Sequence, residues 1–285
     1  MHPREEVFNF DQCENCGLVF LNPRVEPKEL GNYYTEHYLP YRGSDAWGKY
    51  KKFVDKSQKD LDLKRAELVN KFHAITADSI VLDVGCGKPT FLEACYDRFN
   101  SNVIGIDFSD HGWSGEEARF PNVDLRVGEV EDLPETLDPD VITMWHYLEH
   151  DYDPISNLKT LRKVAHNNTS IVIEVPNFDS ESRKKFGKNW AGWHTPRHTQ
   201  LFSPSNIDLL LKSCGWKVRS IMTYGTLDAY TLYWMSRMEK KGIDWTKNME
   251  EEFNGFVMGM ITHFPRRVTE KMRSLGIMTI IADAN

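Results

Sequence analysis

Two acidic residues, each placed within or after an apolar run, carry the clearest chemical signal in this chain. Asp83 lies in the run Val-Leu-Asp-Val and is followed by Gly85 and Gly87, and Asp107 ends the run Ile-Gly-Ile-Asp. Apolar runs of this length are typical of buried parallel strands. Glycines let a backbone approach a ligand closely, and a carboxylate at the end of the second strand can accept both hydroxyls of a ribose. We therefore predict a nucleoside site at the carboxyl ends of two adjacent strands.

The loop between these acids favours one class of nucleoside. A dinucleotide-binding loop has a third glycine, which lets helix and strand pack closely beside the pyrophosphate. This chain has Pro89 near that point, and proline donates no N–H. The pattern resembles motif I of the class I S-adenosylmethionine (SAM) dependent methyltransferases. The resemblance implies that Asp83, Gly85 and Gly87 face the methionine end of SAM and that Asp107 binds the ribose. The cofactor would be SAM, and its product S-adenosylhomocysteine (SAH).

The loop after the third expected strand, residues 123–127, is acidic. In the family that the chain resembles, this loop contacts adenine through an acidic side chain and the next backbone N–H. Carried over by position, these residues are Glu129 and Val130. An acidic surface loop with no ligand is the alternative.

A histidine follows the fourth expected strand, at the edge where open α/β sheets bind ligands. The run Trp-His-Tyr-Leu-Glu-His covers residues 145–150 and resembles the small-molecule branch of the family. By that resemblance His146 points into the cleft as a catalytic candidate. A polar residue with a purely structural role at the strand end is the alternative. We expect Glu149 and His150 to begin the next helix.

The segment 176–204 is long, polar and rich in aromatic residues, and we expect a loop without regular structure. Such loops are often lids or binding loops. Its Pro-Arg-His and Phe-Ser-Pro runs resemble a methyltransferase subfamily associated with sugar, surface-polysaccharide and quinone biosynthesis. Aromatic rings can stack on a sugar or ring substrate. The substrate-binding candidates are Trp190, Trp193, His194 and Arg197, although the tryptophans could instead pin the loop to the core.

His198 is the main catalytic candidate of this segment, because an imidazole can accept a proton from a hydroxyl. Some sugar carbon-methyltransferases that the chain resembles have a Glu-His pair here, and Arg197 replaces that glutamate. A neighbouring cation lowers the pKa of an imidazole and keeps it neutral. The same replacement removes a carboxylate that could fix the tautomer, which favours oxygen methylation over carbon methylation.

The N-terminal run Cys-Glu-Asn-Cys-Gly resembles half of a zinc knuckle. Structural zinc takes four ligands, and Cys13 and Cys16 supply two, with His2 as the sole further candidate. We therefore predict that the chain holds no metal. Tyrosines follow where relatives place an N-terminal arm over the cofactor, and they are Tyr33, Tyr34, Tyr38 and Tyr41.

The elements that would position these residues alternate between strand and helix. Apolar runs near residues 81, 104, 123–127, 140–144, 170–175, 217–222 and 278–282 alternate with helical patterns. We predict a Rossmann-like, doubly wound α/β sheet of seven strands, mostly parallel with one antiparallel strand, as in class I methyltransferases. The expected arm covers 1–44 and the methyltransferase domain 45–285. Within that domain we place a core at about 78–223, a helical insertion at about 225–275 and a last strand at about 277–282.

Composition narrows the classes of molecule that the protein could bind. The net charge of −7 argues against a nucleic-acid partner bound through a basic surface. No apolar stretch approaches the roughly 20 residues of a membrane span, the N-terminus lacks a signal-peptide core, and five unevenly spaced cysteines suit a reducing compartment. We expect a cytoplasmic protein that acts on a small molecule. An apolar helical stripe from Phe253 to Phe264 suggests core packing, a homodimer face or, less favourably, a membrane surface.

Two other functions stay open at this stage. An NAD-dependent oxidoreductase shares the strand–glycine–helix start, but no Tyr-x-x-x-Lys pair follows the fourth strand. A catalytically inactive SAM-binding regulator would keep Asp83 and Asp107 and lose the base in the cleft.

Overall fold

The centre of the molecule is a seven-stranded sheet. The computed structural model describes residues 6–34 and 38–284. The strand order is β5-β4-β3-β6-β7-β10-β9, and β10 runs antiparallel to both of its neighbours while the others run parallel. The predicted Rossmann-like sheet with one antiparallel strand is confirmed. The strands are β3 (Ile80–Val84), β4 (Asn102–Asp107), β5 (Val123–Val127), β6 (Val141–Trp145), β7 (Ser170–Pro176), β9 (Trp216–Met222) and β10 (Ile277–Ala284).

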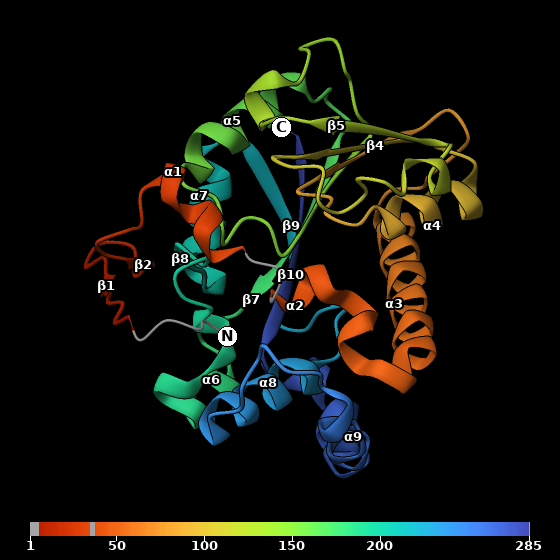
Figure 1. Cartoon of the computed structure of the whole chain (residues 1–285). Coiled ribbons are helices and arrows are strands. Elements are labelled where there is room, and N and C mark those ends of the chain that lie inside the picture. The colour runs from red at the N-terminus through yellow and green to blue at the C-terminus, as the bar shows by residue number, and fades with distance from the viewer. Residues whose placement is uncertain (1–5, 35–37, 285) are drawn as a thin grey trace.

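Helices cover both faces of the sheet (Figure 1). Side chains alternate across a strand, so Val81 packs toward α3 and α4 while Leu82 packs toward α5 and α7. Because both faces of the sheet are buried, its strands are continuous apolar runs. The helices are α3 (Lys51–Phe72), α4 (Thr90–Phe99), α5 (Pro154–Val164) and α7 (Pro204–Ser213).

A second, small sheet joins the N-terminal arm to the segment that follows β7. Strand β2 (Val19–Leu21) pairs with β1 (Phe10–Gln12) on one side and with β8 (Gln200–Leu201) on the other. The segment 176–204 also contains α6 (Glu181–Phe186) and short 3-10 turns. The prediction of a loop without regular structure was therefore wrong, because its backbone groups pair with the arm.

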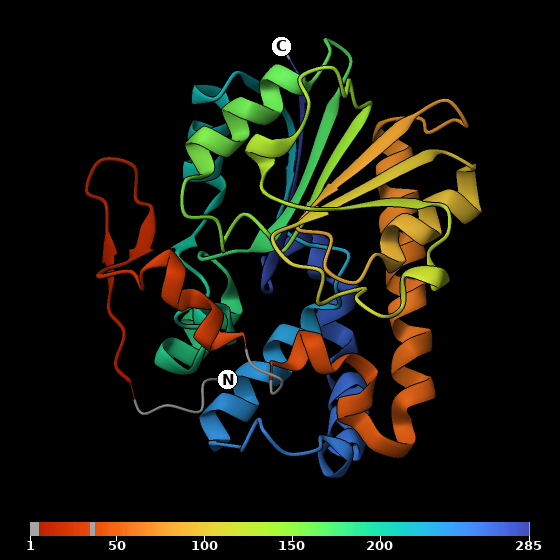
Figure 2. The ribbon, with the colours of Figure 1, turned by 45° about the horizontal axis from the view of Figure 1, so that its top comes forward.

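The region 225–275 contains α8 (Ala229–Lys241) and α9 (Phe253–Val268). These helices and the short α2 (Leu39–Arg42) lie beyond the carboxyl ends of the parallel strands (Figure 2), and α1 (Pro27–Leu30) lies in the arm. The stripe on α9 is divided: Phe253 is buried, whereas Ile261 and Phe264 are exposed. Within the described residues, no helix is both long and apolar enough to span a bilayer.

Candidate active site

One large cavity lies at the carboxyl ends of β3, β4 and β6. Its volume is about 1630 Å³, and its walls include the glycine loop after β3, the end of β4, the N-terminal arm and the segment after β7. Pockets for a single small ligand usually measure ~300–1,000 Å³. The space is therefore sufficient for a nucleoside cofactor together with a second molecule.

The glycine loop and Asp107 form a ready cradle at one end of this cavity. Gly85 has φ +71°, and a Cβ there would lie 2.2 Å from Cδ2 of Tyr147. Gly87 has φ +48°, and its missing Cβ faces open space. The Gly87 amide donates to Oδ2 of Asp107 (3.0 Å) and the Ser109 amide to Oδ1 (3.2 Å). These bonds fix the carboxylate of Asp107, which lines the cavity and has further lone pairs for the hydroxyls of a ribose.

Two predicted cofactor residues, Asp83 and Val130, are not among the residues that line the cavity, although the prediction for Val130 concerned its backbone N–H. Asp83 is buried beneath the loop, where Thr143 Oγ1 donates to its carboxylate (2.6 Å) and burial raises its pKa to about 7. The Val130 side chain is part of the hydrophobic core. Neither residue lines the cavity, whereas Glu129 does. The position of Asp83 suits support of the glycine loop, and its predicted contact with the cofactor stays a prediction.

Four histidines and one glutamate come together at the other end of the cavity. His146, Glu149 and His150 follow β6, whereas His194 and His198 come from the segment after β7. The prediction that Glu149 and His150 begin a helix was wrong. They occupy a turn, and α5 starts only at Pro154, where Asp153 caps it through the Ser156 amide.

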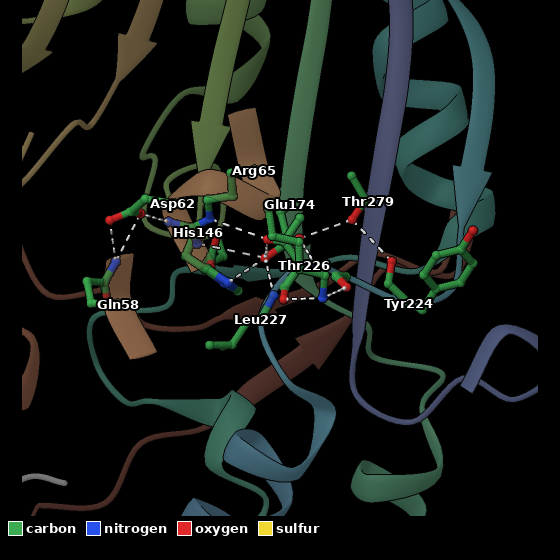
Figure 3. A network of polar contacts seen from close by, with 12 residues as sticks. Gln58, Asp62, Arg65, His146, Glu174, Tyr224, Thr226, Leu227 and Thr279 are labelled. Atoms are coloured by element: carbon green, nitrogen blue, oxygen red, sulfur yellow. Dashed lines mark hydrogen bonds and ion pairs between the residues drawn. The ribbon is translucent and has the colours of Figure 1, made fainter. Parts of the chain in front are cut away.

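His146 is held between two buried carboxylates. Its Nδ1 lies 3.4 Å from Oε1 of Glu149 and its Nε2 lies 3.3 Å from Oε1 of Glu174, as Figure 3 shows for the Glu174 side. Burial opposes protonation, but the two carboxylates outweigh it and raise the pKa of His146 to about 9. His146, one of the two catalytic candidates, is therefore a cation near neutral pH and in that form has no lone pair to accept a proton.

Glu174 organises the network of Figure 3. Its carboxylate accepts hydrogen bonds from the Thr226 amide, the Leu227 amide (3.3 Å) and the Thr279 hydroxyl (3.1 Å). Arg65 of α3 adds an ion pair at 3.8 Å. Burial raises the pKa of Glu174, but His146 and these donors outweigh it and lower the pKa to about 2. One ionised side chain therefore joins α3, β10 and the loop before α8 to the histidine end of the cavity.

His198 has one fixed tautomer. Its Nδ1 lies 2.8 Å from the Gly192 carbonyl, which can only accept, so Nδ1 carries the proton and Nε2 keeps a lone pair. That Nε2 lies 3.9 Å from Oε1 of Glu149. Burial and the neighbouring His150 lower the pKa of His198 to about 3. His198 is thus a neutral hydrogen-bond acceptor on the cavity wall.

The arm closes the cavity over these groups. The Tyr34 hydroxyl lies 3.0 Å from Nδ1 of His150, and the rings of Tyr38 and His194 lie 5.7 Å apart. At the nucleoside end, Tyr41 stacks on His111 at 5.4 Å. Of the four predicted tyrosines, Tyr34, Tyr38 and Tyr41 line the cavity, whereas Tyr33 does not.

Three predicted substrate-binding residues do not line the cavity. Trp190 is 1% exposed and donates to Ser182, and Trp193 packs on Phe10 and donates to the Gly187 carbonyl. These contacts correct their assignment: both tryptophans pin the segment to the core. Arg197 is also buried; it donates to Nε2 of His194 (3.0 Å) and to the Tyr33 carbonyl. Arg197 thus positions His194, which alone of the four lines the cavity.

One cluster in the described part of the chain has the side chains for a cation. Glu149, His150 and His198 place one ligand atom each within 4.8 Å of one another. Cys13 and Cys16 are free thiols that belong to no such group among the described residues. His2, the other candidate of the N-terminal knuckle, lies outside the described residues.

Sequence reasoning missed two residues of the site. Glu174 interrupts the apolar run Ser-Ile-Val-Ile-Glu-Val, and a single acid inside a buried strand was the signal that could have found it. Arg65 lies on a strongly charged helix, where nothing in the pattern separates it from solvent-exposed cations.

Comparison with known proteins identifies the family. Residues 57–221, more than half of the chain, match the methyltransferase domain family. A protein of Mycolicibacterium smegmatis described as a SAM-dependent methyltransferase is 25% identical over 143 residues, which are 50% of this chain and 53% of that protein. The chain therefore belongs to the methyltransferase domain family. It spans about half the length of this curated relative.

Solved structures agree on the fold. The methyltransferase in complex with the Haloferax volcanii activator Trm112 has a TM-score of 0.54 at 17% identity, with 85% of this chain and 97% of that one covered. Mycolic acid cyclopropane synthase CmaA1, complexed with SAH, has a TM-score of 0.53 at 12% identity, with 77% and 82% covered. At these identities the solved structures show the fold alone. The match to the methyltransferase domain family is what favours SAM over NAD as the cofactor.

Proposed function

We propose that this protein transfers the methyl group of SAM to a hydroxyl of a small-molecule acceptor. The acceptor would be of the sugar or quinone type, as in the biosynthetic pathways associated with the subfamily that the sequence resembles. The observation that carries the proposal is that Asp107, the open face of Gly87 and the lone pair of His198 share one cavity. The first two suit a nucleoside, and the third suits a hydroxyl. Cofactor and acceptor would therefore meet beneath the tyrosine arm.

The proposed roles follow from this arrangement. Asp107 holds the ribose, Gly85 and Gly87 give the cofactor room, and Glu129 lies at the adenine end. SAM supplies a methyl carbon whose bond to sulfur breaks, with the electron pair staying on sulfur, as the acceptor oxygen bonds to that carbon. The residues of the chain must hold that oxygen about 3 Å from the methyl carbon.

His198 has the geometry to receive the hydroxyl proton at Nε2. Its low pKa makes it a weak base toward a free hydroxyl. The hydroxyl becomes strongly acidic once its oxygen is bonded to the methyl carbon, so the proton can move late, as the methyl group is transferred. The ionised Glu149, 3.9 Å away, would then stabilise the imidazolium. The protonated His146 lies beside the same carboxylate of Glu149 and partly neutralises its negative charge.

Calorimetric titration with SAM, together with a turnover assay that follows SAH, tests the proposal. We expect SAM to bind and SAH to form in the presence of a hydroxylated acceptor. SAM binding with no turnover on any acceptor would favour the alternative of a catalytically inactive SAM-binding regulator. Binding of NAD and not of SAM would overturn the proposal.

A further inference from the structure

The cavity has two chemically different ends. All of its charged lining residues lie at or before residue 153, on the arm, α3, α4, the end of β4 and the loops, and acidic side chains outnumber basic ones among them. The lining residues beyond residue 175 are apolar apart from two histidines. They are Pro176, Ala191, His194, His198, Leu227, Leu232, Met235 and Ile277.

Both histidines of this second end are uncharged. Burial lowers the pKa of His198 to about 3, and burial together with Arg197 lowers the pKa of His194 well below its usual value. The cations nearest this end, His146 and Arg65, both pair with the buried Glu174, and His146 also faces Glu149. Among the described lining residues, the apolar end therefore presents no unpaired cation to a phosphate or carboxylate. An anionic group placed there would lose its hydration without an ion partner, which is costly.

Leu227, Leu232 and Met235 form an apolar wall of the cavity, which begins directly beside the reacting groups. Oε1 of Glu174 contacts Nε2 of His146 (3.3 Å) and also accepts the Leu227 amide (3.3 Å), as Figure 3 shows. From Leu227 the wall continues along α8 through Leu232 and Met235. The carboxylate of Glu174 thus lies between His146 and Leu227, which packs against the apolar cluster that contains Leu232. A molecule whose hydroxyl reaches His198 would extend along this wall.

We infer that the acceptor is an uncharged molecule with a hydroxyl at one end and an apolar body, and not a sugar nucleotide. The inference rests on the proposed function and selects among its acceptors. A nucleoside diphosphate sugar carries two phosphates and many hydroxyls, which this wall could not satisfy. An alkylated hydroxy-aromatic ring would bury its apolar part against Leu227, Leu232 and Met235 and keep its hydroxyl beside His198.

Binding of para-methylphenol, para-butylphenol and para-heptylphenol tests this inference, with UDP-glucose as the polar competitor. Affinity is measured by calorimetry with and without SAH. We expect it to rise by roughly fourfold per methylene while the chain lies on the wall. A flat series, or tighter binding of UDP-glucose than of para-heptylphenol, would overturn the inference. Failure of SAH to bind would count against the proposed function instead, because the phenol series measured without SAH still reports on the wall.

Matched variants test whether the alkyl chain binds against this wall. Met235→Gln keeps an unbranched side chain and should weaken para-heptylphenol binding about tenfold while SAH affinity stays unchanged. Leu227→Gln is a second variant at a half-buried position of the same wall. Met272→Gln is the control, because Met272 is 88% exposed and outside the cavity. Equal para-heptylphenol affinities for wild type, Met235→Gln and Leu227→Gln would show that the alkyl chain binds elsewhere.

Discussion

Nε2 of His198 lies 3.9 Å from Oε1 of Glu149, although the two residues are 49 positions apart in the chain. The neighbour of His198 in sequence, Arg197, turns away and donates to His194 and to the arm. A carboxylate is therefore present beside His198 after all, contributed by the turn after β6. Gly192, whose carbonyl accepts from Nδ1, fixes the tautomer.

Replacing His198 by glutamine should reduce turnover by about 10²–10⁴, the usual contribution of a general base, and leave SAM affinity nearly unchanged. The reason is that Nε2 is proposed to contact the acceptor and not the cofactor. His166→Gln is the matched control, because His166 does not line the cavity. Full activity in His198→Gln would transfer the role to His194, and loss of SAM binding would show that His198 is structural.

Asp107→Ala should weaken SAM binding by about 1.5–3 kcal/mol, as expected for hydrogen bonds to a charged group. The carboxylate faces the cavity from the end of β4. Calorimetric titration of the variant is compared with that of Asp78→Ala, an exposed acid in the loop before β3. Identical SAM affinities for Asp107→Ala and wild type would remove Asp107 from the site.

The pKa of His146 predicts how stability depends on pH. Its pKa in the folded state, about 9, exceeds the ordinary pKa of 6.5. The stabilisation that its protonation gives the folded state is therefore complete below pH 6.5 and is lost as the pH rises through 9. The whole shift corresponds to on the order of 3 kcal/mol. Urea unfolding between pH 6 and 10 should show a decline in wild type that is reduced in His146→Gln. Parallel curves for the two proteins would mean that His146 is not protonated in the folded state.

Turnover should not require a metal, although zinc should inhibit it. Glu149, His150 and His198 can converge on a cation, but a metal on Nε2 of His198 would remove the proposed proton acceptor. We expect EDTA to leave activity unchanged and micromolar zinc to reduce it reversibly. Loss of activity in EDTA with recovery on adding a divalent ion would instead make this cluster a metal centre.

The N-terminal thiols should carry no stoichiometric zinc. Cys13 and Cys16 supply two ligands, and four are needed for a stable tetrahedral site. Elemental analysis of the purified protein measures this directly. One zinc per chain that disappears in Cys13→Ser would contradict the expectation and point to a ligand from elsewhere.

The sheet could be predicted from the sequence because each strand is a separate apolar run. Strands such as β3, β5 and β7 begin and end within about two residues of the expected positions. The cavity end of β4 was also predictable, since Asp107 marks it.

The histidine end could not be predicted to the same depth. In the segment after β7, Trp190 turns into the core and His194 into the cavity, although they are only four residues apart and equally suited to either place. No periodicity separates them. Their directions depend on pairing with β2 and α8, which are distant in sequence. The contact of Glu149 with His198 depends on the same packing.

The position of β10 has a consequence for how the chain folds. This strand lies between β7 and β9, so it pairs with residues about 60 and 100 positions earlier in the chain. Contacts this distant in sequence slow folding, since a long loop must close before they form. Until residues 277–284 insert, β7 has an unpaired edge, and Glu174 lacks its bond from Thr279. The histidine cluster and the apolar wall therefore reach their final geometry only when β10 is in place.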